Sequence, residues 1–431
     1  MKKLCISILF LAFIFILPSC STYSQTKIKV LTIQENIINP VTADYIAKGI
    51  KIAENEDSIL IITIDTPGGL LKSTEKIVKL ILNSSVPVVS YVYPKGARAA
   101  SAGVFIGYSS HILAMSPSTH IGAAHPVVGG GSWGNLDEET QKKIINDTLA
   151  WAKNISQIRD RPFDFIKEAI EKSISITEKE ALKQGVCDLE ASSLDELIKN
   201  IDGFSVQTKK GEIKISTKDF LVEEISFTKR EKFLNALIEP NIAYLLLTLG
   251  FLGLIFEVTH PGFGFPGIAG IICLLLSFYA FSILPVNYAG IALIILGIIF
   301  FVVEAFTPTF GMFTLGGIIS FFLGSVMLFN QPQFIKVSFR FILPLVISFT
   351  AFSLFILTKA FATFHQKPKV GKEALLDKEA VALTNIKANK KGQVLLRGEI
   401  WEALSQEDIK KDETVIVTGL KGLIVQIEKR R

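Results

Sequence analysis

The chain has 431 residues, which is more than one ordinary domain holds, because single hydrophobic cores stop growing beyond roughly 250–300 residues. The formal net charge is +5 and the lysines are interspersed with acids, which argues against a nucleic-acid partner. The four cysteines form no Cys-x-x-Cys pair, and no His-Glu-x-x-His run occurs. We therefore expect no disulfide framework, no metal and no cofactor.

Residues 1–24 have the layout of a secretory signal peptide. Two lysines precede an apolar run that ends at Pro18, before small residues. The domain that follows is therefore expected to be extracytoplasmic. The Leu-Pro-Ser-Cys run that ends at Cys20 resembles a lipoprotein cleavage box, which would make Cys20 a lipidation site. An uncleaved anchor helix is the alternative.

Apolar runs alternate with amphipathic stretches in residues 25–232. The expected strands are Ile28–Ile33, Ser58–Ile64, Pro87–Val92 and Ile112–Met115. The expected helices are Val41–Glu54, Leu70–Leu82, Ser101–Tyr108, Asp137–Ile158, Asp164–Lys172 and Glu178–Gln184. Continuous β-branched runs indicate strands buried on both faces, and the intervening helices imply a mostly parallel sheet. The sequence predicts an α/β domain that ends with a hairpin over 204–216.

A candidate nucleophile lies between one of these strands and a helix. Ser101 stands in the run Gly96-Ala-Arg-Ala-Ala-Ser-Ala-Gly103. There the helix dipole favours developing negative charge, small neighbours admit a substrate backbone, and the Ala102 amide can reach the reacting oxygen. The alternative is an ordinary N-cap serine in a helix rich in Gly and Ala.

A second loop strengthens the case for catalysis. Asp65-Thr-Pro-Gly-Gly69 follows an apolar strand and precedes a helix, so its glycine amides can line a cleft at the carboxyl end of the strand. We expect backbone amides of Gly68, Gly69 and Ala102 to form an oxyanion hole. Removing one such donor costs about 2.7–4 kcal/mol of transition-state stabilisation.

Residues 233–364 predict a helical membrane domain with about five spans. The expected spans are Asn241–Val258, Pro266–Leu284, Tyr288–Phe306, Phe313–Phe329 and Phe341–Phe361. The run from Glu257 to Gly264 recurs with the same spacing from Glu304 to Gly311, which indicates two copies of a helix–turn–helix unit. Because both glutamates precede the connector between helices, a structural role is favoured over a functional intramembrane carboxylate.

Residues 370–431 predict a small all-β domain. The expected strands are Glu379–Leu383, Lys391–Arg397, Glu399–Ala403, Glu413–Thr418 and Leu423–Glu428. Five short strands separated by glycines suit a small barrel such as an OB-fold. Trp401 has no row of aromatic side chains beside it, so nucleic-acid binding is disfavoured. With an exported N-terminal domain and an odd number of spans, this domain is expected in the cytoplasm.

Four motifs together resemble the NfeD family in its long form, a group of membrane-bound serine proteases of the ClpP class. The motifs are Asp65-Thr-Pro-Gly-Gly69, Ala99-Ala-Ser-Ala-Gly103, the run from Met115 to Pro126, and Gly398-Glu-Ile-Trp-Glu-Ala403. The resemblance covers nearly the whole mature chain. It implies a ClpP/crotonase-like peptidase domain, a multispan segment, an OB-fold and assembly into a homo-oligomer.

The resemblance also implies a Ser-Lys dyad. A serine needs an adjacent base, and a lysine suffices if burial lowers its pKa to about 7–8. The family pattern places the lysine three positions before an asparagine, which selects Lys143; Lys142 competes, although it points about 100° away on a helix. Both lysines could instead be solvated residues at a helix start. His125 is the other alternative, because ClpP uses a histidine near this place, but its register is offset by one residue.

The expected function is an ATP-independent serine endopeptidase in the bacterial cell membrane, since no P-loop motif occurs. The family implies apolar segments of membrane-associated proteins as substrates, and stomatin- or flotillin-like proteins as partners in the lipid membrane. Two other functions stay open. One is a membrane scaffold with a vestigial peptidase domain. The other is an acyl-CoA enzyme of the crotonase type, although an exported domain would not meet cytoplasmic CoA.

Overall fold

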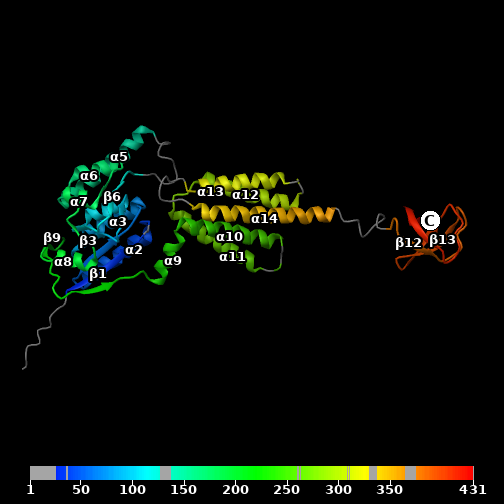
Figure 1. Cartoon of the computed structure of the whole chain (residues 1–431), viewed down its shortest axis with the longest axis horizontal. Coiled ribbons are helices and arrows are strands. Elements are labelled where there is room, and N and C mark those ends of the chain that lie inside the picture. The colour runs from blue at the N-terminus through cyan, green and yellow to red at the C-terminus, as the bar shows by residue number, and fades with distance from the viewer. Residues whose placement is uncertain are drawn as a thin grey trace, which may run out of the picture. The chain divides into compact units, whose positions relative to one another are not determined.

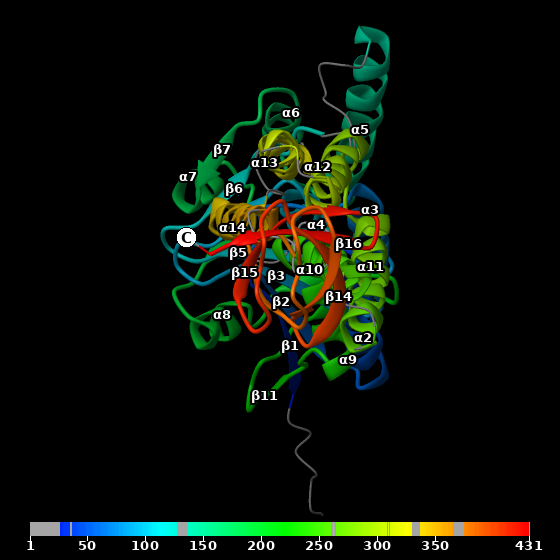
Figure 2. The same cartoon turned by 90° about the vertical axis from the view of Figure 1, so that its right-hand side faces the viewer.

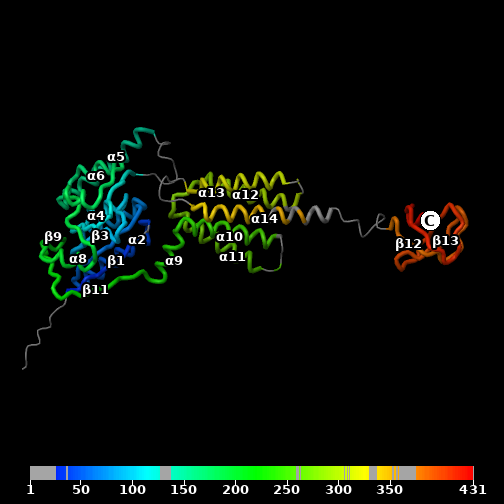
Figure 3. The backbone as a smooth tube through the Cα atoms, viewed as in Figure 1, coloured from blue at the N-terminus to red at the C-terminus, as the bar shows by residue number. Residues whose placement is uncertain are grey.

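The computed structural model describes residues 26–34, 37–126, 137–259, 262, 264–307, 309, 311–329, 337–364 and 375–430 (Figures 1 and 3). The predicted signal peptide and the predicted lipidation site at Cys20 lie outside the described residues. The chain divides into two compact units, Met1–Val302 with Leu315–Thr350, and Val303–Thr314 with Ala351–Arg431.

The N-terminal domain is built on a six-stranded sheet in the order β11-β1-β2-β3-β5-β8, and every neighbouring pair is parallel. The strands are β1 (Lys27–Ile33), β2 (Ile59–Ile64), β3 (Val88–Val92), β5 (Ile112–Met115), β8 (Leu189–Glu190) and β11 (Leu221–Glu224). The predicted α/β domain with a parallel sheet is therefore confirmed. The β11 strand was not predicted, because its sequence Leu-Val-Glu-Glu is short and half acidic.

Helices cover both faces of this sheet. They are α2 (Pro40–Asn55), α3 (Leu71–Leu82), α4 (Ala102–Ser109), α5 (Glu138–Ile158), α6 (Phe163–Glu171), α7 (Glu178–Lys183) and α8 (Leu194–Asn200). One face buries alternate strand residues such as Leu31 and Ile33 under α2, α3 and α4. The other buries Ile28 and Val30 in a cluster with residues of α8 and of the hairpin β9 (Ser205–Thr208)–β10 (Gly211–Lys214). Figure 1 shows α8 and β9 on the side of the sheet away from α2 and α3. Side chains alternate between the faces because the strand period is two.

A second, three-stranded sheet lies beside the start of α4. It consists of β4 (Arg98–Ala100), β6 (His120–Gly122) and β7 (Ser175–Thr177). The β4–β6 pair is parallel and β6–β7 is antiparallel. A Cβ at Gly122 would come within 2.2 Å of the Ile174 carbonyl oxygen, so only glycine allows β7 to approach this closely. This sheet holds the backbone on either side of Ser101.

The following region is helical. Its helices are α9 (Lys229–Leu237), α10 (Pro240–Thr259), α11 (Phe265–Ile283), α12 (Tyr288–Phe306), α13 (Met312–Met327) and α14 (Phe339–Phe364). Among the described residues, Pro240–Val258 and Phe265–Ile283 are long and apolar enough to cross a membrane. The stretches Tyr288–Glu304, Met312–Met327 and Phe339–Ala351 are apolar but shorter.

The two copies of the sequence repeat make matching helix contacts. A Cβ at Gly250 would lie 3.0 Å from the Gly270 carbonyl oxygen, and a Cβ at Gly297 would lie 3.0 Å from that of Gly317. The first pair joins α10 to α11, and the second joins α12 to α13. Both pairs occupy corresponding positions of the repeat. Small residues at these positions let helix backbones approach closely.

Each repeat also has a glutamate that binds the start of the next helix. An Oε atom of Glu257 accepts the Gly264 N–H at 3.1 Å, and one of Glu304 accepts the Gly311 N–H at the same distance. Glu304 further accepts the Thr309 hydroxyl at 3.0 Å and the Thr314 N–H at 3.1 Å. A carboxylate at a helix N-terminus satisfies amides that lack an intrahelical acceptor.

The C-terminal domain is a closed barrel of five strands in the order β12-β13-β14-β16-β15. Figure 2 shows three of these strands, β14, β15 and β16, toward the viewer. The strands are β12 (Glu379–Ala382), β13 (Lys391–Leu396), β14 (Glu399–Leu404), β15 (Thr414–Lys421) and β16 (Ile424–Lys429). Its interior is filled by small and β-branched side chains, such as Ala382, Val394 and Val415. The predicted small all-β barrel is confirmed.

Candidate active site

Ser101 stands at the N-cap position of α4, but it does not act as an ordinary cap. Its φ of 52° and ψ of −107° differ from the extended conformation typical of N-caps, and its side chain makes no capping hydrogen bond. A positive φ is unfavourable for a residue with a Cβ. The backbone is held there by the Ser101 N–H, which donates to the Gly122 carbonyl oxygen at 3.0 Å. The hydroxyl is therefore left for other chemistry.

The Pro-Gly-Gly loop packs directly on Ser101. The Thr66 N–H donates to the Arg98 carbonyl at 2.8 Å, and the Ala100 N–H donates to the Thr66 carbonyl at 3.1 Å, so the loop is paired with β4. A Cβ at Gly68 would lie 2.7 Å from the Ser101 Cβ and 3.1 Å from its Oγ. Because Gly68 also has a φ of +127°, both space and backbone conformation require glycine here. The structure thus brings together the two predicted motifs.

The three predicted oxyanion donors differ in their hydrogen bonding. The Gly68 N–H already donates to the Thr66 hydroxyl oxygen at 3.1 Å. The N–H groups of Gly69 and Ala102 have no hydrogen-bond acceptor among the described residues. Ala102 is the first residue of α4, where an amide has no intrahelical acceptor. Gly69 and Ala102 are consequently the two predicted donors whose amides are available to an oxyanion.

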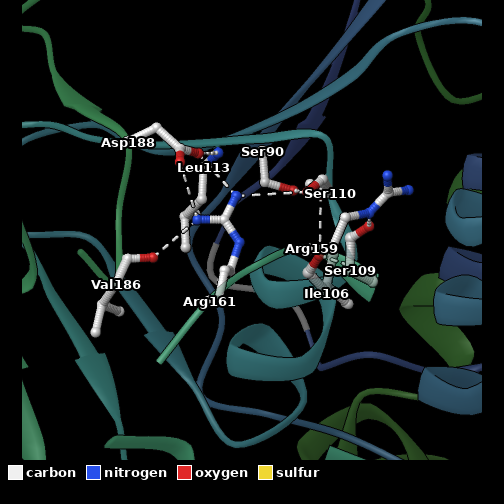
Figure 4. Close-up of polar contacts among 9 residues, drawn as sticks. All are labelled: Ser90, Ile106, Ser109, Ser110, Leu113, Arg159, Arg161, Val186 and Asp188. Carbon is white, nitrogen blue, oxygen red and sulfur yellow. Dashed lines mark hydrogen bonds and ion pairs between the residues drawn. The ribbon is translucent and has the colours of Figure 1, made fainter. Parts of the chain in front are cut away.

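The opposite end of α4 is fixed by two arginines that follow α5 (Figure 4). The Arg159 Nε donates to the Ser109 carbonyl at 2.7 Å. Arg161 is buried and forms an ion pair with Asp188 at 2.7 Å, while that carboxylate also accepts the Leu113 N–H at 2.6 Å. Cations near the C-terminus of a helix are stabilised by the negative end of the helix dipole. Sequence reasoning missed this cluster, because its members are scattered along the chain.

Lys143 lies on α5, where the structure does not bring it to Ser101. The helix buries Thr148, Ala152 and Ile155, a stripe from which Lys143 is rotated by about 140° at 100° per residue. Lys143 is exposed, and it forms no hydrogen bond or ion pair with any described residue. Lys142 is also exposed and pairs with Glu138 at 3.7 Å. Residues 127–136, which connect the serine region to α5, lie outside the described residues.

Helix α5 nevertheless packs directly on the helix that carries the serine. The rings of Trp151 on α5 and Phe105 on α4 are stacked, with centroids 4.5 Å apart and planes 12° apart. Phe105 lies one turn after Ser101, and Trp151 lies about two turns after Lys143. The stacked pair therefore sets the spacing between the lysine helix and the serine helix.

The alternative base, His125, is half-buried and oriented by the backbone. Its Nδ1 lies 2.8 Å from the Ile170 carbonyl oxygen, an atom that can only accept, so Nδ1 carries the proton. Nε2 of a neutral ring is then unprotonated. Sequence reasoning sought an orienting carboxylate and could not anticipate a carbonyl from a distant helix.

Two other reactive side chains of the domain are unsuited to catalysis. His111 accepts the Val88 N–H at 3.0 Å, and burial together with the nearby Arg159 lowers its pKa to about 3. Cys187 is buried, and burial raises the pKa of its thiol to about 12, so it stays protonated. Among the described residues, no group of three His, Cys, Asp or Glu side chains could hold a metal ion.

Three family descriptions match successive parts of the chain. Residues 27–209 match the NfeD1b N-terminal domain, 241–359 the NfeD integral membrane domain, and 372–429 the NfeD-like C-terminal, partner-binding domain. The membrane-bound protease PH1510 of Pyrococcus horikoshii is 34% identical over 406 residues, which is 91% of each chain. The chain belongs to the NfeD family. This NfeD protein is a membrane protein, and the predicted family resemblance is confirmed.

Two further proteins are similar to this chain. The membrane protein NfeD1b of Bacillus subtilis is 29% identical over 344 residues, 77% of this chain and 73% of that protein. Among solved structures, the membrane protease 1510-N of Pyrococcus horikoshii, specific for a stomatin homolog, is 31% identical. It covers 49% of this NfeD chain and 98% of its own, with a TM-score of 0.42.

Proposed function

We propose that this NfeD protein is a membrane-anchored, ATP-independent serine endopeptidase with Ser101 as its nucleophile. The observation that carries the proposal is the uncapped Ser101 hydroxyl at the start of α4, packed against Gly68. A positive helix end and a glycine loop packed on the hydroxyl suit acyl transfer. The PH1510 relative is named a membrane-bound protease, which supports the same reaction class.

The proposed reaction follows from this geometry. The Ser101 Oγ attacks the peptide carbonyl carbon while its proton passes to the base, and the Gly69 and Ala102 amides donate to the oxyanion. Collapse of the tetrahedral intermediate breaks the C–N bond, and the base returns the proton to the leaving amine. Water then hydrolyses the acyl-enzyme by the same route in reverse. The Gly68 amide would join the oxyanion hole only by releasing Thr66.

Lys143 is the proposed base. A lysine acts as a base near neutral pH only when burial lowers its pKa to about 7–8. Because Lys143 is exposed in the single chain, we propose that bound substrate or a second copy of the chain covers it. His125 is the second candidate base, supported by the carbonyl that fixes its Nδ1 proton.

The proposal includes a membrane arrangement and partners. Five spans, formed by helices α10 to α14, would leave the peptidase domain outside the cytoplasm and the barrel inside it. The family resemblance supports apolar segments of membrane-associated proteins as substrates and stomatin- or flotillin-like proteins as partners. A scaffold with an inactive peptidase domain is the second candidate, favoured by the partner-binding description of the barrel family and the exposed lysine.

Covalent labelling with a fluorophosphonate tests the proposed dyad. We expect labelling of the wild-type protein, none of Ser101→Ala, and a decrease of 100-fold or more in Lys143→Ala, in line with the roughly 10²–10⁴-fold contribution of a general base. Lys142→Ala is the matched control and should label at the wild-type rate. If His125→Ala loses labelling and Lys143→Ala does not, His125 and not Lys143 is the general base.

Equal labelling of wild type and Ser101→Ala would overturn the assignment of Ser101 as the nucleophile. Absence of labelling in every variant, together with no cleavage of a stomatin-like protein by the wild type in lipid nanodiscs, would favour the scaffold. Cleavage without labelling would show only that the probe does not enter, and the same variants would then be compared by cleavage rate.

A further inference from the structure

The outer surface of the barrel carries a row of apolar side chains that crosses three strands. Val381 on β12 is directly opposite Leu395 on β13, and Leu395 is directly opposite Ile400 on β14. Directly opposite residues in antiparallel strands have Cβ atoms about 4.5–5.5 Å apart. The three side chains therefore form one continuous strip, which we name the apolar row.

The apolar row faces solvent within the barrel. Its members are 37%, 39% and 64% exposed for Val381, Leu395 and Ile400, whereas their neighbours Ala382, Val394 and Leu396 are fully buried in the barrel core. Because strand residues alternate between faces, the row is on the outer surface and contributes nothing to the core. Isolated exposed apolar residues are ordinary, whereas a contiguous row across three strands is a candidate interaction surface.

The charges beside the row are neutralised within the barrel. Glu402, two positions after Ile400 on the same face of β14, pairs with Lys391 at 2.9 Å. Glu379, two positions before Val381 on β12, pairs with Arg430 at 2.7 Å. The described barrel, residues 375–430, has ten basic and nine acidic side chains. It therefore offers no strong field for an anionic lipid surface or a nucleic acid.

We propose that the apolar row is the surface through which the barrel binds its protein partner, and that the partner presents an apolar segment to it. The family description states that this domain binds a partner, but it does not locate the surface. An apolar centre with paired charges at its edge is the anatomy of a protein–protein contact. The partner is the stomatin-like protein, and in this respect the inference rests on the proposed function.

Binding of the purified stomatin-like protein of the same organism to the full-length chain in nanodiscs tests the apolar row. The double variant Leu395→Thr/Ile400→Thr places threonine, a good strand former, at both positions while removing apolar surface. We expect its Kd to rise tenfold or more, as for truncation of central interface residues. Leu376→Thr is the matched control, because Leu376 is 37% exposed on the same domain but outside the row. It should bind within about twofold of the wild type.

Two further measurements separate the causes of a negative result. Fluorophosphonate labelling of Ser101 should be unchanged in both variants. If partner binding is lost while labelling is retained, the apolar row acts in partner binding and not in the peptidase reaction. A photoreactive benzoylphenylalanine at position 400 should cross-link to the partner. Cross-linking to lipid or to a second copy of the chain would overturn the proposal, as would unchanged affinity of the double variant or absence of binding by the wild type.

Discussion

Gly68 touches Ser101 where the two predicted motifs meet, so its substitution tests that contact. In Gly68→Ala the new Cβ would collide with the serine side chain, and the φ of +127° would disfavour any L side chain at about 1–3 kcal/mol. We expect fluorophosphonate labelling to fall about 100-fold, because a displacement near 1 Å has this effect on reacting groups. Gly96→Ala is the control, since Gly96 also has a positive φ but open space around it.

His111 makes the domain sensitive to acid. Its pKa of about 3 in the fold is below the usual value near 6.5, so between these pH values the unfolded chain binds a proton that the folded chain excludes. Stability therefore falls as the pH drops below about 6.5, by up to about 2 kcal/mol at pH 5. Thermal unfolding of wild type and His111→Asn at pH 7 and pH 5 measures the difference.

Asparagine retains an acceptor for the Val88 N–H but does not titrate. The variant should consequently lose less stability than the wild type over this range. His120→Asn, at an exposed histidine, should behave like the wild type. If His111→Asn has the same acid sensitivity as the wild type, another group controls it.

At the level of single residues, sequence predicted positions better than environments. Ser101 could be placed before a helix from the Gly/Ala-rich run and the preceding strand. Its unusual φ and ψ could not be predicted, because they depend on Gly122 and on the loop around Thr66, both of which are distant in sequence. The exposure of Lys143 could not be predicted either, since helical spacing alone does not determine which face of α5 packs on α4.

Among the elements, the two glutamate contacts of the repeat differ in strength. Glu304 accepts three hydrogen bonds within its own turn, whereas Glu257 accepts one from the described residues. Removing a buried acceptor costs about 1–3 kcal/mol for each donor that is left unsatisfied. We expect Glu304→Ala to lower the unfolding midpoint of the protein in detergent micelles more than Glu257→Ala does. Equal effects would mean that the additional bonds to Thr309 and Thr314 contribute nothing.

The longer elements were predictable from sequence, and the shortest were not. The strands β1 and β2 are continuous apolar runs and α2 has a helical apolar period, so their limits differ from the predicted ones by at most one residue. The strands β4, β6 and β7 have three residues each, too few for a period to appear. Only pairing between distant segments makes them strands, and this pairing is what positions Ser101.

For the whole molecule, the number of spans decides where the barrel lies. With five spans, a cysteine at the exposed position Lys183 of the peptidase domain should react with an impermeant maleimide in intact spheroplasts. A cysteine at the exposed position Lys421 of the barrel should react only after permeabilisation. Both are introduced with Cys273→Ser, which leaves the buried Cys187 as the one remaining cysteine of the described residues; Cys5 and Cys20 belong to the predicted signal peptide. Labelling of both positions in intact spheroplasts would require an even number of spans.

The architecture as a whole was predictable because each module has its own pattern: β-branched runs, long apolar helices, and short strands divided by glycines. The relative position of the two proposed dyad residues was not predictable. Ser101 is fixed by the three-stranded sheet and the Pro-Gly-Gly loop, whereas Lys143 is carried by a helix that contacts the serine helix through the ring stack of Trp151 and Phe105. No local pattern in the chain encodes that approach.

The conformation of Ser101 has an evolutionary consequence. At a φ of 52° and a ψ of −107°, glycine would be more stable than serine, because it has no Cβ to resist this backbone. Selection for stability alone would favour glycine at this position. A serine at this position exchanges folding stability for a reactive hydroxyl group. The domain gives up folding stability at the residue that carries the hydroxyl.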